Sequence, residues 1–314
     1  MKRLKILIWH IHGSYLNYLS CAPHDFYLPI KQERSSGYQG LGETFDWGKN
    51  VFEVPAEEVK NLKLDLIIFQ SPKNFLIDQY EILSEKQRKL PKIYLEHNTP
   101  REHPTDTKHL IDDPKILLVH VTHFNNLMWN SGKTQTLVIE HGLPDPSVTF
   151  RGNLAKGVVV VNEIQRRDRI AGYDIWQKAK EKVPLDLIGM RSEELGGRGD
   201  IPHRALFGEL ALYRFFFNPI RYTSLPLSLI EAMMVGLPVV ALATTEVASV
   251  VENNVSGFVS NDLDFLIGKI RFLLGYPEEA KKIGQKGRET ALVKFGIDRF
   301  VKNWNKAFEE VRNL

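Results

Sequence analysis

The feature that most constrains this chain is an alternation of short apolar runs with longer amphipathic stretches, which occurs in two successive series. Short apolar runs bounded by turn residues are typical of buried strands, and longer amphipathic stretches are typical of helices. Strands that alternate with helices form parallel sheets covered by those helices. The sequence therefore predicts an α/β fold.

The first series predicts one lobe at the start of the chain. Its expected strands and helices are Leu4–Trp9, Asp65–Gln70, Phe75–Lys89 (helix), Lys92–Glu96, Ile116–Thr122, His123–Asn130 (helix) and Thr136–Ile139. Pro91 cannot continue a helix, so we expect the first of these helices to end before the strand that follows it.

The second series predicts a second lobe with the same architecture. Its expected elements are Gly157–Val161, Gly172–Lys182, Leu185–Ile188, Ala205–Leu212, Arg214–Asn218, Leu227–Val235, Pro238–Leu242 and Ser256–Ser260. From Asp262 to Leu314 the pattern becomes almost wholly helical, and Phe300, Trp304 and Phe308 share one apolar face. We expect this C-terminal tail to pack back across both lobes.

The segment Glu140–Asn153 is rich in proline and glycine and carries little apolar pattern. It predicts a linker between an N-terminal domain, 1–150, and a C-terminal domain, 151–314. A chain of 314 residues is long enough for two such domains. Ligands of open α/β sheets bind at the carboxyl ends of the strands, so the expected site is a cleft in which two such sheets face each other.

Composition excludes several classes of protein. No apolar stretch is long enough for a membrane span, and the interrupted apolar run at the N-terminus is interpreted as a strand rather than a secretory signal. Cys21 is the only cysteine, which excludes an internal disulfide and favours a cytoplasmic location. A net charge of +3 is too small to indicate a nucleic-acid partner.

The same charge permits weak contact with an anionic membrane surface. Lys86, Arg88 and Lys89 near a helix end would contribute to such contact. The alternative is an ordinary solvated helix face, which charge runs of this kind usually form.

The segment Leu225–Val240 predicts a helix with Pro226 in its first turn and Gly236 as its stop. A helix start that follows a strand through a tight turn presents unpaired amides and the positive end of the helix dipole, which together bind phosphate. The amides of Leu227 and Ser228 are the expected donors. One turn further on, the Glu231 carboxylate is suited to accept both hydroxyls of a ribose. The alternative is that Glu231 lies on the surface and Gly236 merely ends a helix.

The string Asn218-Pro, Leu227-Ser-Leu-Ile-Glu-Ala-Met-Met-Val-Gly-Leu-Pro-Val-Val240 and Val255-Ser-Gly-Phe-Val259 resembles the signature region of glycosyltransferase family 4. The resemblance implies the GT-B fold, with two Rossmann-like lobes whose parallel sheets face each other across a cleft. It further implies a retaining transfer, with the acceptor on the N-terminal domain and a nucleoside diphosphate sugar on the C-terminal domain. The expected donor is a UDP- or GDP-sugar, with a UDP-sugar favoured.

The resemblance assigns roles to residues around this signature. The glutamate that aligns with Glu231 binds the nucleotide ribose, and amides at the preceding helix start, here Leu227 and Ser228, bind the diphosphate. The family usually has a second glutamate eight residues earlier, where this chain has Thr223. This departure indicates either a divergent subgroup of the family or a donor sugar held by Thr223 and nearby amides, with Ser224 as a further candidate.

A basic segment follows the strand Gly157–Val161, where the family places a loop against the diphosphate. Arg166, Arg167 and Arg169 are the candidates, because guanidinium groups offset the charge that develops on a leaving phosphate. The family's usual basic residue before the glycine is Ala171 here. A solvated basic loop is the alternative.

Two positions in the first lobe complete the expected site. His97 follows the strand Lys92–Glu96 and looks like the family's first-lobe histidine, which contacts and orients the donor sugar. Gly13 follows the first strand, where a glycine lets a ligand approach the backbone closely.

The histidines near His97 raise the alternative of a metal site. His103, His109, His120 and His123 lie close in sequence, but they lack the helical spacing and the matching carboxylate of a zinc motif. GT-B transferases generally work without a bound metal, so we expect neither a metal nor a cofactor.

The sequence thus predicts transfer of a sugar to a glycan or a lipid-linked acceptor, as in polysaccharide or glycoconjugate synthesis. A nucleotide-sugar epimerase of the same fold is the first alternative, since it would act on the donor without an acceptor. A two-lobed binding protein without catalysis is the second, because Thr223 stands where the family has a glutamate.

Overall fold

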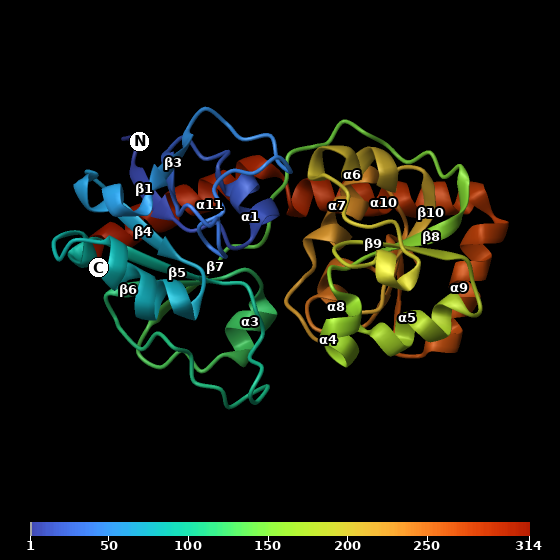
Figure 1. Cartoon of the computed structure of the whole chain (residues 1–314). Helices are drawn as coiled ribbons and strands as arrows, with labels where there is room; N and C mark the ends of the chain where they lie inside the picture. Colours follow the sequence, from blue (N-terminus) through green and yellow to red (C-terminus); the bar gives the residue numbers. More distant parts are fainter. Residues whose placement is uncertain (1) are drawn as a thin grey trace. The chain divides into compact units, whose positions relative to one another are not determined.

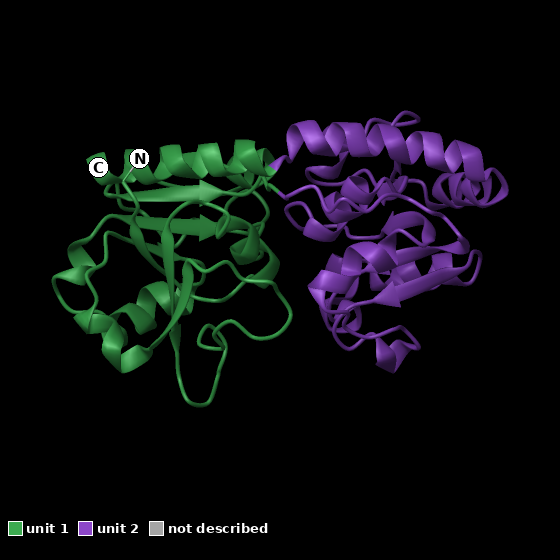
Figure 2. Ribbon diagram, turned by 90° about the horizontal axis from the view of Figure 1, so that it is seen from above, with its two compact units in different colours: residues 1–142, 297–314 green, residues 143–296 purple. Residues whose placement is uncertain are grey.

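The computed structural model describes residues 2–314 and divides into two compact units (Figures 1 and 2). Unit 1 runs up to Gly142 and includes Ile297–Leu314, and unit 2 is Leu143–Gly296. The sequence predicts domains 1–150 and 151–314, whereas in the structure the chain leaves unit 1 earlier and returns to it for its last helix.

Unit 1 contains a seven-stranded sheet in the order β3-β2-β1-β4-β5-β6-β7. Every neighbouring pair is parallel. The strands are β1 (Lys5–Ile8), β2 (Asp25–Ile30), β3 (Val51–Pro55), β4 (Leu66–Phe69), β5 (Lys92–Glu96), β6 (Ile116–His120) and β7 (Gln135–Val138). All residues of β4 and β6 are buried, which explains why these strands are unbroken apolar runs in the sequence.

Strands β2 and β3 are absent from the sequence prediction. Pro29 lies inside β2 and Pro55 ends β3. Proline cannot donate a hydrogen bond to a neighbouring strand, so a run that contains it does not indicate a central strand. In the structure β2 nevertheless pairs with neighbours on both sides.

The helices of unit 1 are short, apart from the last one. They are α1 (Gly13–Leu19), α2 (Gln79–Ile82), α3 (His123–Met128) and α11 (Ile297–Glu310), with 3-10 turns at Ala56–Asn61, Gln87–Lys89 and Val311–Asn313 and a π-helical turn at Asn74–Asp78. The prediction of one helix over Phe75–Lys89 is wrong. Leu83 is extended, and Ser84 accepts a hydrogen bond from the Gln87 amide, so its side chain begins a separate turn.

Helix α11 packs on unit 1 through the apolar face that the sequence predicts. Phe300, Trp304 and Phe308 are buried, and the Trp304 indole N–H lies 3.2 Å from the Tyr15 hydroxyl on α1. The tail is therefore shared, because α9 and α10 belong to unit 2 and α11 to unit 1.

Unit 2 contains a five-stranded parallel sheet in the order β12-β11-β10-β8-β9. Its strands are β8 (Leu154–Val160), β9 (Leu185–Ile188), β10 (Tyr213–Asn218), β11 (Val239–Leu242) and β12 (Gly257–Ser260). Its helices are α4 (Ile164–Ala171), α5 (Tyr173–Lys180), α6 (His203–Leu210), α7 (Leu227–Val235), α8 (Val247–Val250), α9 (Leu263–Gly275) and α10 (Pro277–Lys294), with a 3-10 turn at Glu193–Leu195. The alternation of strands and helices confirms the predicted α/β class.

Helix α7 has the predicted bounds and ends at Gly236, which adopts the left-handed conformation (φ 90°) that glycine favours. Helix α10 packs closely on this end, because a side chain at Gly284 would lie 1.9 Å from the Gly236 carbonyl oxygen. The Arg288 guanidinium on α10 also donates to the Met234 carbonyl. These contacts fix α7 from its C-terminal end.

Across residues 2–314, every helix is too short or too polar to cross a membrane.

Candidate active site

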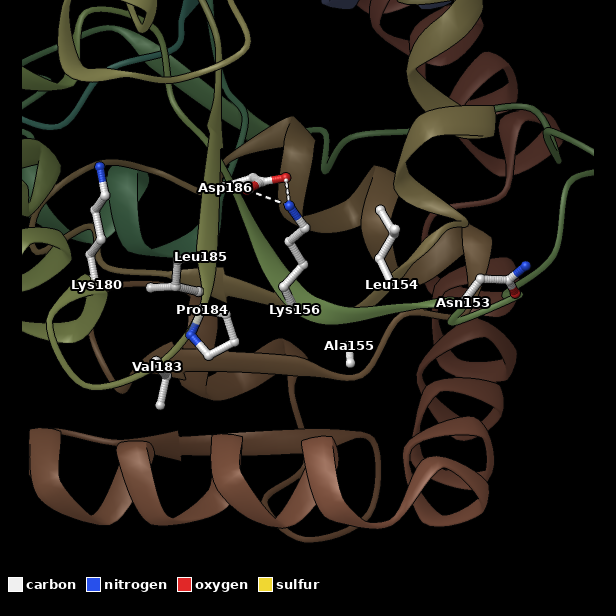
Figure 3. A pocket seen from close by; sticks show the side chains of 9 residues that line it. All are labelled: Asn153, Leu154, Ala155, Lys156, Lys180, Val183, Pro184, Leu185 and Asp186. Atoms are coloured by element: carbon white, nitrogen blue, oxygen red, sulfur yellow. Dashed lines mark hydrogen bonds and ion pairs between the residues drawn. The ribbon is translucent and has the colours of Figure 1, made fainter.

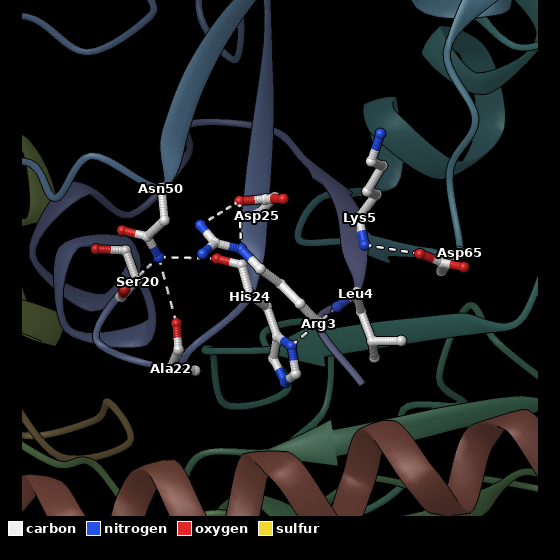
Figure 4. Close-up of polar contacts among 9 residues, drawn as sticks. All are labelled: Arg3, Leu4, Lys5, Ser20, Ala22, His24, Asp25, Asn50 and Asp65. Carbon is white, nitrogen blue, oxygen red and sulfur yellow. Dashed lines mark hydrogen bonds and ion pairs between the residues drawn. The ribbon is translucent and has the colours of Figure 1, made fainter. Parts of the chain in front are cut away.

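The amino ends of several strands in unit 1 are occupied by contacts that hold the fold together. In unit 1, the Asn50 amide donates to the carbonyls of Ser20, Ala22 and His24, and the Lys5 amide donates to Asp65 (Figure 4). The side chains of Asn50 and Asp65 thus provide hydrogen-bond partners for backbone groups at strand ends and in a loop.

Unit 2 has a cavity of about 450 Å³ at the corresponding edge (Figure 3). Its lining residues are Asn153, Leu154, Ala155, Lys156, Lys180, Val183, Pro184, Leu185 and Asp186. The Lys156 ammonium and the Asp186 carboxylate pair with each other at 3.0 Å. The cavity lies where β8 and β9 begin, which is opposite the carboxyl edge at which such sheets bind ligands. We therefore build the candidate site at the carboxyl edges.

In unit 2, β10 ends at Asn218 and the chain reaches α7 at Leu227 through residues 219–226, the donor loop hereafter. Pro226 precedes the helix and its side chain provides no cap. The Ser228 hydroxyl donates to the Val160 carbonyl at the end of β8 (3.1 Å), which ties the helix start to the centre of the sheet. The amides of Leu227 and Ser228 thus begin a helix at the carboxyl edge, the geometry that binds anions.

Glu231 lies one turn into α7 and is buried, with 3% of its surface exposed. Its Oε1 lies 3.0 Å from Nε2 of His203, the first residue of α6. A buried carboxylate needs hydrogen-bond donors to offset its lost hydration, and His203 is one of them. The burial excludes the alternative that Glu231 is a surface residue.

Sequence reasoning did not identify the side chain of His203 as part of the site. The available signal was the acid on an otherwise apolar helix face, which predicts a donor but does not say where in the chain it lies. The pair joins residues 28 positions apart.

The donor loop is held on two sides. On one side, the hydroxyls of Thr244 and Thr245 donate to the carbonyls of Ile220 and Ser224. Ser224 is buried, and the adjacent Thr223 is half-buried. The structure therefore places Thr223 and Ser224 in an anchored loop directly before the α7 start.

On the other side, Arg221 binds the junction of α4 and α5. Its guanidinium contacts both oxygens of Asp174, at 2.5 and 2.7 Å, and donates to the Arg169 carbonyl at 2.9 Å. Gly172 at the junction has φ 76°, and a side chain there would lie 1.9 Å from the Pro219 carbonyl oxygen. The hydrogen bonds from Arg221 lower the pKa of the Asp174 carboxyl group.

Arg169 shares the carboxylate that Arg221 binds. Its guanidinium lies 3.2 Å from Asp174, and its side chain is 70% exposed. Arg169 and Arg221 thus share the Asp174 carboxylate beside the donor loop.

Arg166 and Arg167 lie on α4, where the sequence predicts a loop. The segment is helical up to a kink at Asp168 (φ 43°, ψ −126°), a conformation that non-glycine residues rarely adopt. Arg166 pairs one-to-one with Glu163 at 2.5 Å and is exposed, and Arg167 is half-buried. The hydrogen bond from Arg166 lowers the pKa of Glu163.

In unit 1, His97 directly follows β5 and is buried. Its Nε2 lies 3.0 Å from Oε1 of Gln70, which follows β4, and the Gln70 amide in turn donates to the Trp9 carbonyl. This chain of bonds sets Nε2 as the protonated ring nitrogen. The His12 ring lies beside His97, with 4.0 Å between centroids.

Both imidazoles are uncharged at neutral pH. Burial lowers the pKa of His97 well below its ordinary value, and the neighbouring His12 and His141 add to the shift. Burial also lowers the pKa of His12 to about 4.

Gly13 begins α1 beside this cluster. A side chain there would lie 2.5 Å from the Phe45 ring and 2.9 Å from Nε2 of His10. The structure thus gives Gly13 a packing role, because these rings leave no room for a larger residue.

Of the other histidines, His109 lies 3.3 Å from Glu96 and His120 is fully buried. Burial lowers the pKa of His120 to about 3. Within the described chain, residues 2–314, no group of three or more His, Cys, Asp or Glu side chains is arranged to hold a metal ion.

Comparison with known proteins shows which proteins this fold and this edge are similar to. Residues 206–290 match the family model described as glycosyl transferases group 1. This segment contains the second half of α6, the donor loop and α7, so the match includes the buried Glu231 but begins after His203. This part of the chain is therefore similar to glycosyl transferases group 1, in agreement with the resemblance of the signature region. No curated protein matches the chain significantly.

Solved structures of low sequence identity share the fold over the whole chain. Sucrose-phosphate synthase (tll1590) from Thermosynechococcus elongatus is 15% identical, with a TM-score of 0.73 over 98% of this chain and 99% of that one. A glycosyltransferase from Rickettsia africae ESF-5 is 13% identical, with a TM-score of 0.71 over 99% of both chains. Anabaena Alr3699/HepE in complex with UDP and glucose is 15% identical, with a TM-score of 0.70 over 98% of this chain and all of that one. These likenesses confirm the GT-B fold.

Proposed function

We propose that this protein transfers a sugar from a nucleoside diphosphate sugar, with a UDP-sugar favoured, to a glycan or a lipid-linked acceptor. The observation that carries the proposal is the uncapped start of α7 followed one turn later by the buried Glu231. An anion site and a carboxylate at this spacing fit the diphosphate and the ribose of one nucleotide. The complex of HepE with UDP and glucose supports the choice of base.

In the proposed mechanism, unit 2 stabilises the leaving diphosphate. The amides of Leu227 and Ser228 and the guanidinium groups of Arg166, Arg167 and Arg169 would offset the charge that develops as the glycosidic bond breaks. Glu231 would hold the ribose. Interactions that strengthen as this charge develops lower the barrier to transfer.

The sugar itself would be contacted by uncharged groups. Thr223 and Ser224 in the donor loop, with His97 and the backbone at Gly13 in unit 1, are the proposed contacts. A neutral imidazole can donate and accept hydrogen bonds, which suits sugar hydroxyls. We propose retention at the anomeric carbon without a covalent nucleophile, a metal or a cofactor. A cytoplasmic location and weak contact with a membrane surface stay predictions.

The proposal is tested by thermal-shift screening against nucleoside diphosphates and their sugars, because stabilisation rises with ligand affinity. We expect UDP and at least one UDP-sugar to raise the unfolding temperature. No stabilisation by any nucleotide would contradict the proposal.

Product analysis then separates the alternatives. Slow release of free nucleoside diphosphate from the stabilising sugar nucleotide, and faster release with an acceptor, is expected of a transferase. An epimerised nucleotide sugar without release would indicate an epimerase. Stabilisation with no turnover would indicate a binding protein.

A further inference from the structure

We propose that His203 is a positioning residue, which orients the Glu231 carboxylate and so sets how strongly the protein recognises the ribose hydroxyls of its nucleotide. The inference rests on the proposed role of Glu231 in ribose binding. It assigns a role to a residue outside the signature helix.

The pair is buried and well aligned for a hydrogen bond. His203 Nε2 lies 3.0 Å from Glu231 Oε1, and the two side chains are only 12% and 4% exposed. At this distance the imidazole N–H donates to the carboxylate. Solvent screening is weak at such low exposure, so the bond restrains the carboxylate more than a surface pair would.

The His203 ring is itself fixed in place. It stands edge-on to the Phe207 ring one turn along α6, with 5.5 Å between centroids. Pro202 precedes it and limits the backbone conformations at the start of the helix. Because α6 also packs against α7, the imidazole approaches Glu231 from a rigid neighbouring element.

The chemistry of the pair explains how orientation affects recognition. A carboxylate offers about four lone-pair sites, so a bond from His203 to one oxygen is compatible with bonds from a vicinal diol. Two hydroxyls on adjacent ribose carbons require a defined carboxylate plane. Loss of the imidazole donor would let that plane rotate and would weaken both hydroxyl contacts together.

The test compares UDP with 2′,3′-dideoxy-UDP as ligands of the full-length wild type, His203→Phe and His203→Gln, by isothermal titration calorimetry. Phenylalanine keeps a ring but removes the donor, and the glutamine amide restores a donor. We expect the wild type to prefer UDP, and His203→Phe to lower that preference about five- to tenfold through a loss of UDP affinity alone. His203→Gln should recover most of the preference.

Other outcomes overturn the inference in distinguishable ways. An unchanged preference in His203→Phe would show that the imidazole does not act through Glu231. An equal loss of affinity for both ligands would indicate a general structural role. A wild type that binds UDP and its dideoxy form equally would instead refute the ribose role of Glu231, and the proposal with it.

A Glu231→Ala background provides the matched control. If His203 acts through Glu231, His203→Phe should have no further effect on UDP affinity in that background. A further loss of the same size as in the wild type would contradict the inference.

Discussion

At the carboxyl edge of the unit 1 sheet, imidazoles and an amide surround His97, and the Glu96 carboxylate ends β5. At the same edge of the unit 2 sheet, guanidinium groups lie beside the start of α7. His97 hydrogen-bonds to Gln70 and has a pKa well below its ordinary value. In unit 2, Arg221 and Arg169 share Asp174 beside the start of α7.

This difference indicates a division of labour between two sheets of the same parallel type. An edge with guanidinium groups and a helix start suits a diphosphate, whereas neutral imidazole and amide groups suit sugar hydroxyls. Variants at each of the two edges test that division.

The largest effect is expected for Glu231→Ala. Loss of charge-assisted hydrogen bonds to the ribose should weaken UDP binding by roughly 1.5–3 kcal/mol, or about 10- to 150-fold in Kd. Calorimetric titration measures this change directly, and Glu181→Ala, which removes an exposed carboxylate of unit 2, is the matched control. An unchanged Kd in Glu231→Ala would show that Glu231 does not bind the ribose.

The second prediction concerns the imidazoles at the carboxyl edge of the unit 1 sheet. Burial lowers the pKa of His12 from 6.5 to about 4, so the folded state resists its protonation. The stability gained from a neutral His12 is complete above pH 6.5 and is lost progressively as the pH falls toward 4. At pH 5 the loss should reach at most about 2 kcal/mol of unfolding free energy.

His12→Asn isolates this contribution, because it removes the titrating ring and keeps a polar side chain. Chemical unfolding of the wild type and the variant at about pH 7.5 and pH 5 should show a smaller loss of stability in the variant. Equal losses would mean that His12 titrates normally and that this edge is not held neutral by burial.

The sequence predicts an element well where residues at its own ends mark its bounds. Pro226 and Gly236 mark both ends of α7, and the structure has that helix with the same bounds. Strands β2 and β3 are not predicted, because Pro29 and Pro55 argue locally against a strand. In the structure, pairing with neighbouring strands overrides this local preference.

In the candidate site, too, the sequence predicts local features but not contacts between distant residues. Glu231 stands out locally, as an acid on an apolar helix, and the sequence identifies it. Its partner His203 lies in another helix, and the contact of Arg221 with Asp174 joins residues 47 positions apart. Such pairs follow from how the strands are ordered in the sheet, and a single sequence carries no local pattern for them.

The third prediction tests whether the carboxyl edge of the unit 2 sheet depends on an anchored donor loop. Arg221→Ala removes a two-point contact with Asp174 and the bond to the Arg169 carbonyl. We expect UDP affinity to fall by about 1.5 kcal/mol, or roughly tenfold, because the loop before α7 loses one of its two anchors.

Arg221→Lys retains the charge but not the two-point geometry, so it should recover only part of the affinity. Calorimetric titration of both variants with UDP measures the effect. Full recovery in the lysine variant would show that charge alone matters at this position and that the anchoring is irrelevant.

The smallest effects should separate the arginines on α4 and beside it. Arg166 is paired one-to-one with Glu163, whereas Arg169 competes with Arg221 for Asp174 and is 70% exposed. Recruiting Arg166 to a diphosphate would break its ion pair with Glu163, but recruiting Arg169 leaves Asp174 bound by Arg221. We therefore expect Arg169→Ala to weaken UDP binding by about 0.5–1 kcal/mol and Arg166→Ala by less. Titrations at low and high salt should show the greater loss of salt dependence in Arg169→Ala, since Arg169 shares its carboxylate with Arg221 and is more exposed. The reverse order would mean that the diphosphate draws Arg166 away from Glu163, and that the shared carboxylate holds Arg169 in place.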